Sequence, residues 1–411
     1  MQTEVIAPQS GVSVRHCFDT GSLTEKQSAL VILYFAGFST QLGFGIITPA
    51  IPVYAQIMGA TGFWIGLIIA SFSVSKTLFL SFFGGMSDAC GRRTLLIVGM
   101  SGFSLFSALY VLATTVQVLV IIRFFTGIFA AMVFPVAVAY VGDLAETGEE
   151  GKLMGEFNSI SYLGMSFGPL IGGMLMDYAG YSSAFLFLAF IIACGAAIVL
   201  FRLPDYRPVI KGRPAALRAF RHPLLMIPVL FYCIYSVTYV AFLFYIPLIA
   251  HDADGLSATS SGMLLLIGML AMAGTQKIFG RFADRFDKYL LLSIGISIIA
   301  CGALCMACTG CYPVLLGGIV LFGMGLGLSL TTVCALVTIA GRNTGQGSAA
   351  AAVNVVQGIC FITVPVIFGL LMDSAGIVSV FLVTGIVAFG AVPFLILCKK
   401  PDPGTCLNGK K

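Results

Sequence analysis

Two cationic side chains lie within long apolar runs of the sequence, Lys76 in the run 62–83 and Arg123 in the run 117–140. A charged side chain inside a membrane costs roughly 2.5–3.5 kcal/mol on insertion scales, so such residues are functional candidates by default. Ammonium and guanidinium groups form strong charge-assisted hydrogen bonds with carboxylate or phosphate oxygens. Because Glu156 is the only acid within a predicted span, the two cations indicate an electropositive path for an anionic or zwitterionic substrate.

Both cations also have a structural interpretation. Lys76 lies eight residues before Gly84, so its ammonium could reach the cytoplasmic surface along its own apolar stem. Arg123, near the outer end of its run, could be held by backbone carbonyl groups. We favour a role in substrate binding or coupling for both residues, with the structural roles as alternatives.

Uncharged polar side chains occur in several of the apolar runs and are expected to line the same path. Their amide, hydroxyl and phenol groups can hydrogen-bond a substrate. The tyrosines at positions 232, 235 and 239 share one helix face, where aromatic packing is an alternative role. Besides the two cations, the predicted path residues are Gln41, Ser73, Asn158, Tyr162, Tyr235, Tyr239, Asn354 and Gln357.

A glycine-rich charged segment separates the second apolar run from the third. Its sequence is Gly84-Gly85-Met86-Ser87-Asp88-Ala89-Cys90-Gly91-Arg92-Arg93, and a related segment runs Gly280-Arg281-Phe282-Ala283-Asp284-Arg285. Glycines let helices approach closely, and a carboxylate can accept hydrogen bonds from helix ends or arginines. The pattern suits a hinge on the cytoplasmic side.

The composition describes the elements that must position these side chains. Of 411 residues, 59% are hydrophobic and only 9% are charged, whereas soluble domains have about 25% charged residues. So few charges cannot cover a water-facing surface, which excludes a soluble enzyme. No nucleophile–base set or phosphate-binding loop is recognisable, and we expect no cofactor and no nucleic acid partner. The cysteines lie mostly inside apolar runs as small hydrophobic residues, so no metal site is expected.

Apolar runs between charged or turn-rich breaks predict twelve membrane-spanning helices. A membrane β-barrel would instead show alternating segments of about ten residues. If the chain begins in the cytoplasm, nearly all of its 22 lysines and arginines fall on the inner side, as the positive-inside rule requires. The predicted spans are 29–57, 62–83, 94–114, 117–140, 153–176, 183–201, 224–249, 259–279, 289–308, 312–340, 348–372 and 377–398.

The chain repeats itself at a fixed offset of 196 residues. Asn158 corresponds to Asn354, and Leu175-Met176-Asp177 recurs as Leu371-Met372-Asp373. The repeat predicts an all-α membrane protein of two six-helix bundles, 29–201 and 223–398, joined by a basic cytoplasmic linker at 202–222. Residues 1–28 and 399–411 are predicted to be cytoplasmic tails. Parallel repeats of this kind place a substrate path at their interface, near the membrane midplane.

Four motifs, in order along the chain, resemble those of the major facilitator superfamily. The glycine-rich segment resembles motif A, and Arg123-Phe124-Phe125-Thr126-Gly127 resembles motif B. The segment 164–173 is similar to motif C, which is associated with proton antiport. The segment 43–52 is similar to the first-helix signature of twelve-span drug:proton antiporters, so the resemblance covers nearly the whole chain.

This resemblance implies the major facilitator fold and secondary transport driven by a proton gradient. The position of Asp143 resembles the acidic partner of motif A. Pro169 is expected to bend its helix, because it removes a backbone hydrogen bond, whereas the motif C glycines have close packing as an alternative role. The implied gating residues are Gly84, Asp88, Gly91, Arg92, Arg93, Asp143, Gly164, Gly168, Pro169, Gly172, Gly173, Gly280, Asp284 and Arg285.

The sequence therefore favours a proton-coupled exporter of a small organic anion or zwitterion, such as a metabolite or a carboxylate siderophore. One alternative is a multidrug exporter of neutral or cationic compounds. Another is a non-transporting sensor or scaffold with the same fold, since Ala89 stands where motif A usually has Arg or Lys. We expect a monomer in the lipid bilayer of a plasma membrane, in the simplest case a bacterial inner membrane, with both termini in the cytoplasm.

Overall fold

The computed structural model describes residues 23–146, 149–205, 223–280, 286–308, 312–344 and 346–397, and every regular element in these ranges is a helix. Twelve of the helical segments within these ranges are long and apolar enough to span a membrane. Helices satisfy their own backbone N–H and C=O groups, which find no water partner in lipid. The chain is therefore a multi-pass membrane protein with twelve spans.

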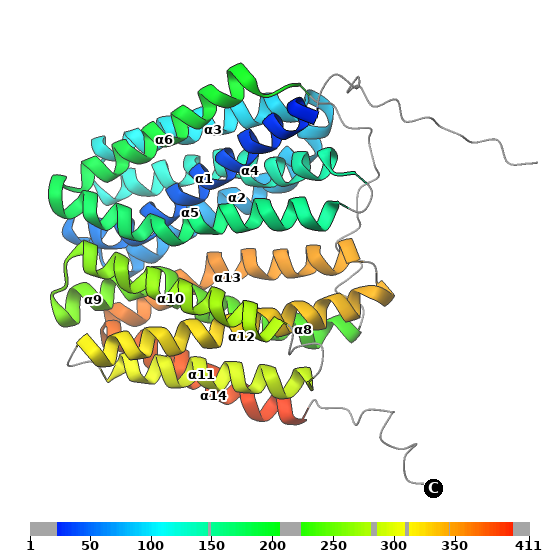
Figure 1. Cartoon of the computed structure of the whole chain (residues 1–411). Coiled ribbons are helices and arrows are strands. Elements are labelled where there is room, and N and C mark those ends of the chain that lie inside the picture. Colours follow the sequence, from blue (N-terminus) through cyan, green and yellow to red (C-terminus); the bar gives the residue numbers. More distant parts are fainter. Residues whose placement is uncertain are drawn as a thin grey trace, which may run out of the picture.

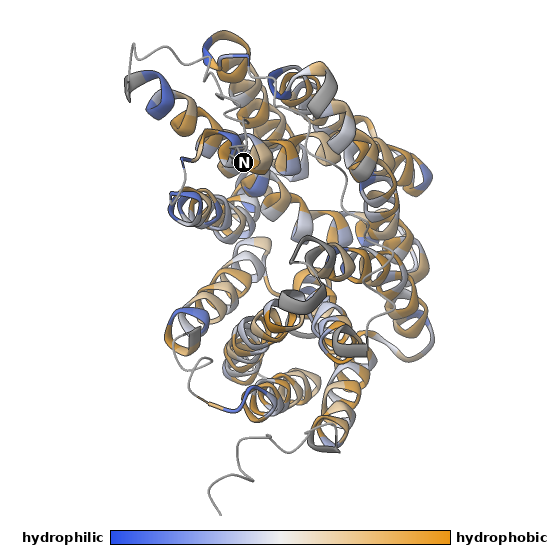
Figure 2. Ribbon diagram, turned by 90° about the vertical axis from the view of Figure 1, so that its right-hand side faces the viewer, coloured by the Kyte–Doolittle hydropathy of each residue, from blue (hydrophilic) through white to orange (hydrophobic). Residues whose placement is uncertain are grey.

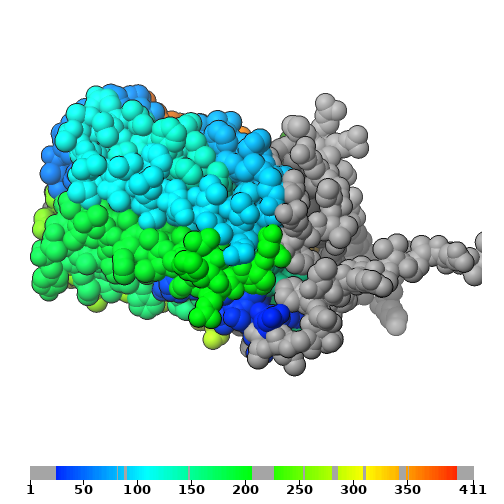
Figure 3. All heavy atoms as spheres, turned by 90° about the horizontal axis from the view of Figure 1, so that it is seen from above, coloured from blue at the N-terminus to red at the C-terminus, as the bar shows by residue number. Residues whose placement is uncertain are grey.

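The spans form two bundles of six, which lie one above the other in Figure 1. Viewed from above, the coloured part of the visible face belongs mainly to the first bundle, in blue to green (Figure 3). The N-terminal bundle consists of α1 (Leu23–Ile57), α2 (Gly62–Cys90), α3 (Arg92–Leu109) extended by η1 (Tyr110–Leu112), α4 (Val116–Leu144), α5 (Glu150–Ala179) and α6 (Tyr181–Arg202). The C-terminal bundle consists of α8 (Pro223–Val240), η2 (Ala241–Tyr245) and α9 (Ile246–Asp254), which together make one span, then α10 (Ala258–Gly280), α11 (Lys288–Ala307), α12 (Tyr312–Thr344), α13 (Gln346–Ala375) and α14 (Ile377–Leu397).

The first helix begins and the last helix ends at the same end of the molecule, on the right in Figure 1, which we call the termini end. The opposite end, which we call the turn end, carries short glycine-containing connections. Gly59 and Gly255 have φ of +82° and +56°, and Gly180 and Gly376 have φ of +79° and +78°. Positive φ is readily adopted only by glycine. Because each pair is separated by 196 residues, the repeat extends to the backbone conformation of the turns.

Several helices are longer than the apolar runs that predicted them. The run 62–83 lies in a helix that continues to Cys90, the run 153–176 lies in α5, and residues 23–28 of the predicted tail are helical. Hydropathy detects only the part that crosses hydrocarbon, while the helix continues into the polar interface with its backbone hydrogen bonds intact. The predicted linker lies mostly outside the described residues.

The predicted span 224–249 is interrupted by a π-helical segment, η2. Pro247 follows it and has no N–H group, so the carbonyl of Leu243 loses its usual helical donor. Single π-helical turns often occur where the hydrogen-bond ladder of a helix is broken in this way. The seventh span is therefore locally irregular next to the tyrosines of α8.

Apolar residues cover the spans around much of their circumference, and hydrophilic residues gather at the helix ends (Figure 2). Large side chains such as Phe82, Ile121, Phe190 and Phe389 are more than half exposed. Exposed apolar surface of this extent is unusual for a protein in water and normal for one in lipid. The lipid bilayer is thus the solvent of the outer surface.

Candidate functional site

The two bundles meet through equivalent helix pairs, α2 with α13 and α5 with α10. A Cβ atom added at Gly66 would lie 2.3 Å from the carbonyl oxygen of Pro365. A Cβ atom added at Gly262 would lie 2.2 Å from the carbonyl oxygen of Pro169. Glycine is required at both positions because any side chain would collide with the backbone of the other bundle.

The glycines of motif C have two different surroundings. An added Cβ at Gly164 would lie 2.5 Å from the carbonyl oxygen of Phe38, and one at Gly168 would lie 2.6 Å from Cα of Gly45. Gly172 similarly faces α1, but Gly173 faces the start of α10 in the other bundle. Most of motif C therefore packs α5 against α1, and its last glycine belongs to the bundle interface.

The motif B glycine brings α4 against α2 at Phe72. An added Cβ at Gly127 would lie 2.4 Å from the carbonyl oxygen of Phe72. One turn earlier on α4, Cζ of Arg123 lies 4.8 Å from the centroid of the Phe72 ring. Nζ of Lys76, one turn along α2 from Phe72, lies 5.8 Å from the same centroid. The two cations predicted from the sequence are therefore brought together around one aromatic ring, which we call the Phe72 site.

The charges of the Phe72 site have no anionic partner among the residues that the structure describes. Arg123 is 1% exposed, and its Nε atom has no hydrogen-bond partner. Each cation–π contact contributes about 0.5–2 kcal/mol, which offsets only part of the cost of burying a charge. Because Phe72 precedes Lys76 on α2, the ammonium extends away from the termini end rather than toward that surface.

The predicted tyrosines form an aromatic wall across from α5. The ring centroids of Tyr232 and Tyr235 are 5.5 Å apart, as are those of Tyr235 and Tyr239, and Tyr239 also contacts Phe361 of α13. Tyr162 of α5 is within electrostatic range of all three α8 tyrosines although it belongs to the other bundle. Tyr162 is 56% exposed, so its ring is accessible.

The predicted amides differ in their partners. Gln41 donates to Sδ of Met165 at 3.9 Å. Asn158, Asn354 and Gln357 make no hydrogen bond within the described ranges, although each is at least partly exposed. Asn158 lies one turn before Tyr162 on α5, and Gln357 lies one turn before Phe361 on α13. Two of the three free amides are thus next to the aromatic wall.

The motif A segment makes a polar cluster at the termini end. The Nε of Arg92 forms an ion pair with Asp143 at the end of α4, and Nη1 of Arg92 donates to Oγ of Ser87 at 3.2 Å. Arg93 donates to the carbonyl oxygen of Leu200. Gly91, with φ of +94°, makes the tight turn between α2 and α3. The cluster therefore ties α2, α3, α4 and α6 together at this end.

Other predicted gating residues contribute less to this cluster. No neighbouring helix in the described ranges lies within 4 Å of a Cβ added at Gly84, so no close approach seen there explains that glycine. Asp88 lies in the last turn of α2, and its side chain lies outside what the structure describes. Gly280 ends α10, and Asp284 and Arg285 lie outside the described residues.

The prediction that Glu156 is the only acid within a span is wrong, because the spans are longer than the apolar runs. The fifth span extends from Glu150 to Ala179 and includes Asp177, and the eleventh includes Asp373. Glu156 accepts a hydrogen bond from the hydroxyl of Tyr34 at 3.0 Å near the termini end. The sequence carries a signal for these two acids, because they stand at equivalent positions of the two repeats.

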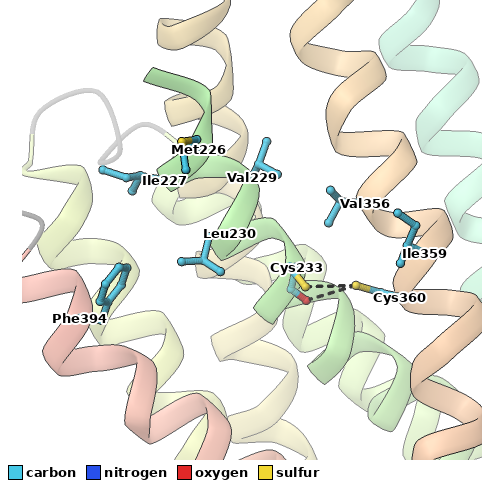
Figure 4. A pocket seen from close by; sticks show the side chains of 9 residues that line it. All are labelled: Met226, Ile227, Val229, Leu230, Cys233, Val356, Ile359, Cys360 and Phe394. Atoms are coloured by element: carbon cyan, nitrogen blue, oxygen red, sulfur yellow. Dashed lines mark hydrogen bonds between the residues drawn. The ribbon is translucent and has the colours of Figure 1, made fainter. Parts of the chain in front are cut away.

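An apolar pocket of about 570 Å³ lies between α8, α13 and α14, away from the Phe72 site (Figure 4). Its thiol groups are Cys233 and Cys360, whose Sγ atoms are 3.4 Å apart. None of its lining residues in the described ranges is charged, so it suits an apolar group such as an acyl chain. Its lining residues are Met226, Ile227, Val229, Leu230, Cys233, Val356, Ile359, Cys360 and Phe394.

Comparison with known proteins matches residues 33–365 to the Major Facilitator Superfamily. An uncharacterized MFS-type transporter of Methanocaldococcus jannaschii is 28% identical over 378 residues, which are 87% of this chain and 96% of that protein. Multidrug resistance protein 1 of Bacillus subtilis is 25% identical over 357 residues, 85% of this chain and 91% of that protein. The crystal structure of the nucleoside transporter NupG, 12% identical, matches in fold with a TM-score of 0.79 over 90% of this chain and 100% of that chain.

Proposed function

The chain belongs to the major facilitator superfamily of secondary transporters, and on this premise we propose that it exports small organic molecules that carry an anionic group. The observation that carries the proposal is the Phe72 site, where two cations lie without an acidic partner in the part of the chain that the structure describes. A carboxylate or phosphate bound between Arg123 and Lys76 would supply the missing counter-charge. Charge-assisted hydrogen bonds of this kind contribute about 1.5–3 kcal/mol each.

The aromatic wall supports the apolar part of this proposal. Tyr162 and Tyr239 offer ring surface and hydroxyl groups, and the buried Tyr235 stacks on Tyr239, which suits an organic molecule with a ring or chain beside its anionic group. Asn158 and Gln357 supply free amides for its remaining polar atoms. A zwitterion fits the same arrangement, because the phenol oxygens can accept hydrogen bonds from an ammonium group.

The distribution of basic residues supports an orientation with the termini end in the cytoplasm. Apart from Lys76 and Arg123, the lysines and arginines within the described ranges lie at the termini end. No lysine or arginine of these ranges lies at the turn end. The Arg92–Asp143 cluster then lies on the cytoplasmic side. Proton-driven antiport in a plasma membrane remains part of the proposal and rests on the motif C resemblance.

A multidrug exporter of neutral or cationic compounds is the second candidate. It is favoured by the name of the Bacillus subtilis relative and by the aromatic side chains of α8 and α13. The two candidates differ in what they require of the Phe72 site. An exporter of cations gains nothing from two uncompensated positive charges, whereas an exporter of anions depends on them.

Uptake into inverted membrane vesicles with an imposed pH gradient tests the proposal, with an aromatic carboxylic acid and its uncharged methyl ester as matched substrates. We expect the acid to be transported in preference to the ester, and Lys76→Gln to reduce uptake of the acid alone. Uptake of the ester and of a cationic analogue at rates above that of the acid would support the second candidate instead. Vesicles lacking the protein supply the background rate.

A further inference from the structure

At the turn end, a carboxylate of the N-terminal bundle binds the first residues of a helix in the other bundle. Asp177, in the last turn of α5, accepts hydrogen bonds from the backbone N–H groups of Ala258 at 3.1 Å and Thr259 at 2.8 Å. These residues begin α10. The first N–H groups of a helix have no partner within the helix itself, and they carry partial positive charge.

The C-terminal bundle makes the same contact in the opposite direction. Asp373, in the last turn of α13, accepts hydrogen bonds from the backbone N–H groups of Gly62 at 2.5 Å and Phe63 at 2.8 Å. These residues begin α2 in the N-terminal bundle. The start of α2 has no side-chain cap from its own segment, whereas at the start of α10 the hydroxyl of Ser257 accepts from the N–H of Ser260 at 3.2 Å. The two carboxylates therefore bind N–H groups at the helix starts of the other bundle, alone on α2 and together with Ser257 on α10.

The two contacts are related by the repeat. Each residue of one contact lies 196 positions from its counterpart in the other, so the pair obeys the approximate two-fold symmetry between the bundles. Gln56 donates to both carboxylate oxygens of Asp252, at 2.8 and 3.0 Å, and these two residues are themselves repeat equivalents. A residue that meets its own equivalent lies at the symmetry axis, which therefore passes through the turn end.

Close backbone packing holds the carboxylates within reach of the helix starts. A Cβ added at Gly62 would lie 2.3 Å from the carbonyl oxygen of Gly369, and one at Gly173 would lie 2.3 Å from that of Ala258. Both contacts join α2 to α13 or α5 to α10 within one turn of the acids. Because the acids are at the exposed surface, water can replace them when the bundles separate.

We infer that Asp177 and Asp373 are positioning residues that hold the turn end of the transporter closed. The inference rests on the proposed transport function, but not on the charge of the substrate. A substrate path between two bundles must open at each end in turn, and every bond that joins the bundles at one end stabilises the state in which that end is closed. Release of the substrate at the turn end requires both carboxylates to leave their helix starts.

Hydrogen–deuterium exchange of the protein in lipid nanodiscs tests this inference without any substrate. Asp177→Ala and Asp373→Ala remove one carboxylate each. Loss of a helix cap is expected to shift the ratio of open to closed turn ends by roughly three- to thirtyfold, and exchange at the starts of α2 and α10 should accelerate accordingly. In the double variant, the ratio of open to closed turn ends should change by the product of the two single-variant changes, because the two contacts share no partner. Asp177→Asn and Asp373→Asn, which keep one acceptor oxygen without the charge, should fall between the wild type and the alanine variants.

The termini end distinguishes a gate from local fraying. If opening of the turn end accompanies closure of the opposite end, exchange near Ser87 and Gly91 should slow in the same variants. Faster exchange at the starts of α2 and α10 with no change at the termini end would overturn the inference, as would no change at either end. The exchange experiment does not depend on the charge of the substrate. Vesicle uptake tests that charge separately.

Ser183→Ala and Ser379→Ala are matched controls at the same end of the molecule. Their hydroxyls donate to Leu175 and Gly180, and to Leu371 and Gly376, which are all within their own bundles. Like the two acids, they are repeat equivalents at helix ends, in the first turns of α6 and α14. If exchange in these serine variants changes as much as in the aspartate variants, any lost hydrogen bond at this end has the same effect. That result would also overturn the inference.

Discussion

The contact of α4 with α2 has a close counterpart in the other half of the molecule, where α12 packs against α10. A Cβ added at Gly127 would lie 2.4 Å from the carbonyl oxygen of Phe72, and one at Gly323 would lie 2.2 Å from that of Gly268. These positions are separated by 196 residues. The two halves therefore share the backbone approach that a glycine permits.

The side chains around the two approaches differ in kind. In the N-terminal half, Arg123 lies over the Phe72 ring. In the C-terminal half the position of the arginine is held by Ile319, which is fully buried. The ring of Phe242 occupies the space next to Gly268 and stacks on Phe322, with centroids 6.0 Å apart.

The difference shows that the repeated backbone does not require a charge at this place. Met272 is likewise the equivalent of Lys76, so both cations are additions to one half only. A packing role would be served by the apolar residues that the other half uses. The comparison therefore favours a functional reason for the charges, with a cationic wall on one side of the path and an aromatic wall on the other.

The largest effect on transport is expected from Arg123→Leu, which places an apolar side chain in the N-terminal half where the C-terminal half has Ile319. Transport of the carboxylic acid should fall by about a hundredfold or more, because two charge-assisted hydrogen bonds are lost. The thermal unfolding temperature in detergent should be unchanged or higher, since an unpaired buried charge is removed. A variant that transports normally would contradict the assignment, and so would loss of transport caused only by poor folding. Ile319→Val is the matched control and should retain transport.

Lys76→Gln should weaken transport of the acid by about ten- to a hundredfold, as expected for one charge-assisted bond. Lys76→Arg keeps the charge with a different geometry and should retain part of the activity. The measurement is the concentration dependence of uptake for the acid and for its methyl ester. Met272→Gln, the equivalent change in the other half, should affect both substrates by less than about twofold. Equal losses for acid and ester in Lys76→Gln would show a role in folding or gating.

Phe72→Leu removes the ring that both cations share while leaving an apolar residue at the contact with Gly127. We expect uptake of the acid to fall by roughly three- to tenfold, because the cations lose their cation–π contacts and their fixed positions. Phe72→Tyr keeps the ring face and should transport nearly as well as the wild type. If leucine and tyrosine variants transport equally, the ring has no role in placing the charges.

The smallest effect concerns the equivalent amides Asn158 and Asn354. Neither makes a hydrogen bond in the described part of the chain, so alanine at either position should leave the unfolding temperature unchanged. Loss of one substrate hydrogen bond should reduce uptake by roughly two- to tenfold. We expect the larger reduction for Asn158→Ala, which belongs to the half with the cations. A larger reduction for Asn354→Ala would place the polar end of the substrate in the other half.

Much of the fold could be predicted because its determinants are local. Twenty or so consecutive apolar residues are sufficient to define a membrane span, and the offset of 196 residues is visible in the chain itself. Helix ends were predicted less well, as α5 shows, because the residues that extend a helix into the interface are not apolar. The π-helical segment before Pro247 was missed, although the proline was a usable signal.

The candidate site was only partly predictable. A charge in an apolar run stands out, so Lys76 and Arg123 were found from residue type alone. Phe72 was missed because one phenylalanine among 34 carries no distinguishing signal. Asp177 was noticed as part of the repeat, but its bonds to α10 depend on contacts between residues about eighty positions apart.

By itself the sequence determined which segments cross the membrane, that the chain is built from two equivalent halves, and that two charges are placed where lipid would penalise them. These properties follow from transfer free energies and from residue order, neither of which depends on how the helices pack. The tertiary structure decided that both charges share one ring, that Tyr162 lies near the tyrosines of the other bundle, and that two acids cap helices across the interface. Such contacts arise only when glycines at particular turns bring two helix backbones together, because a hydrogen bond or a cation–π contact acts only over a few ångströms.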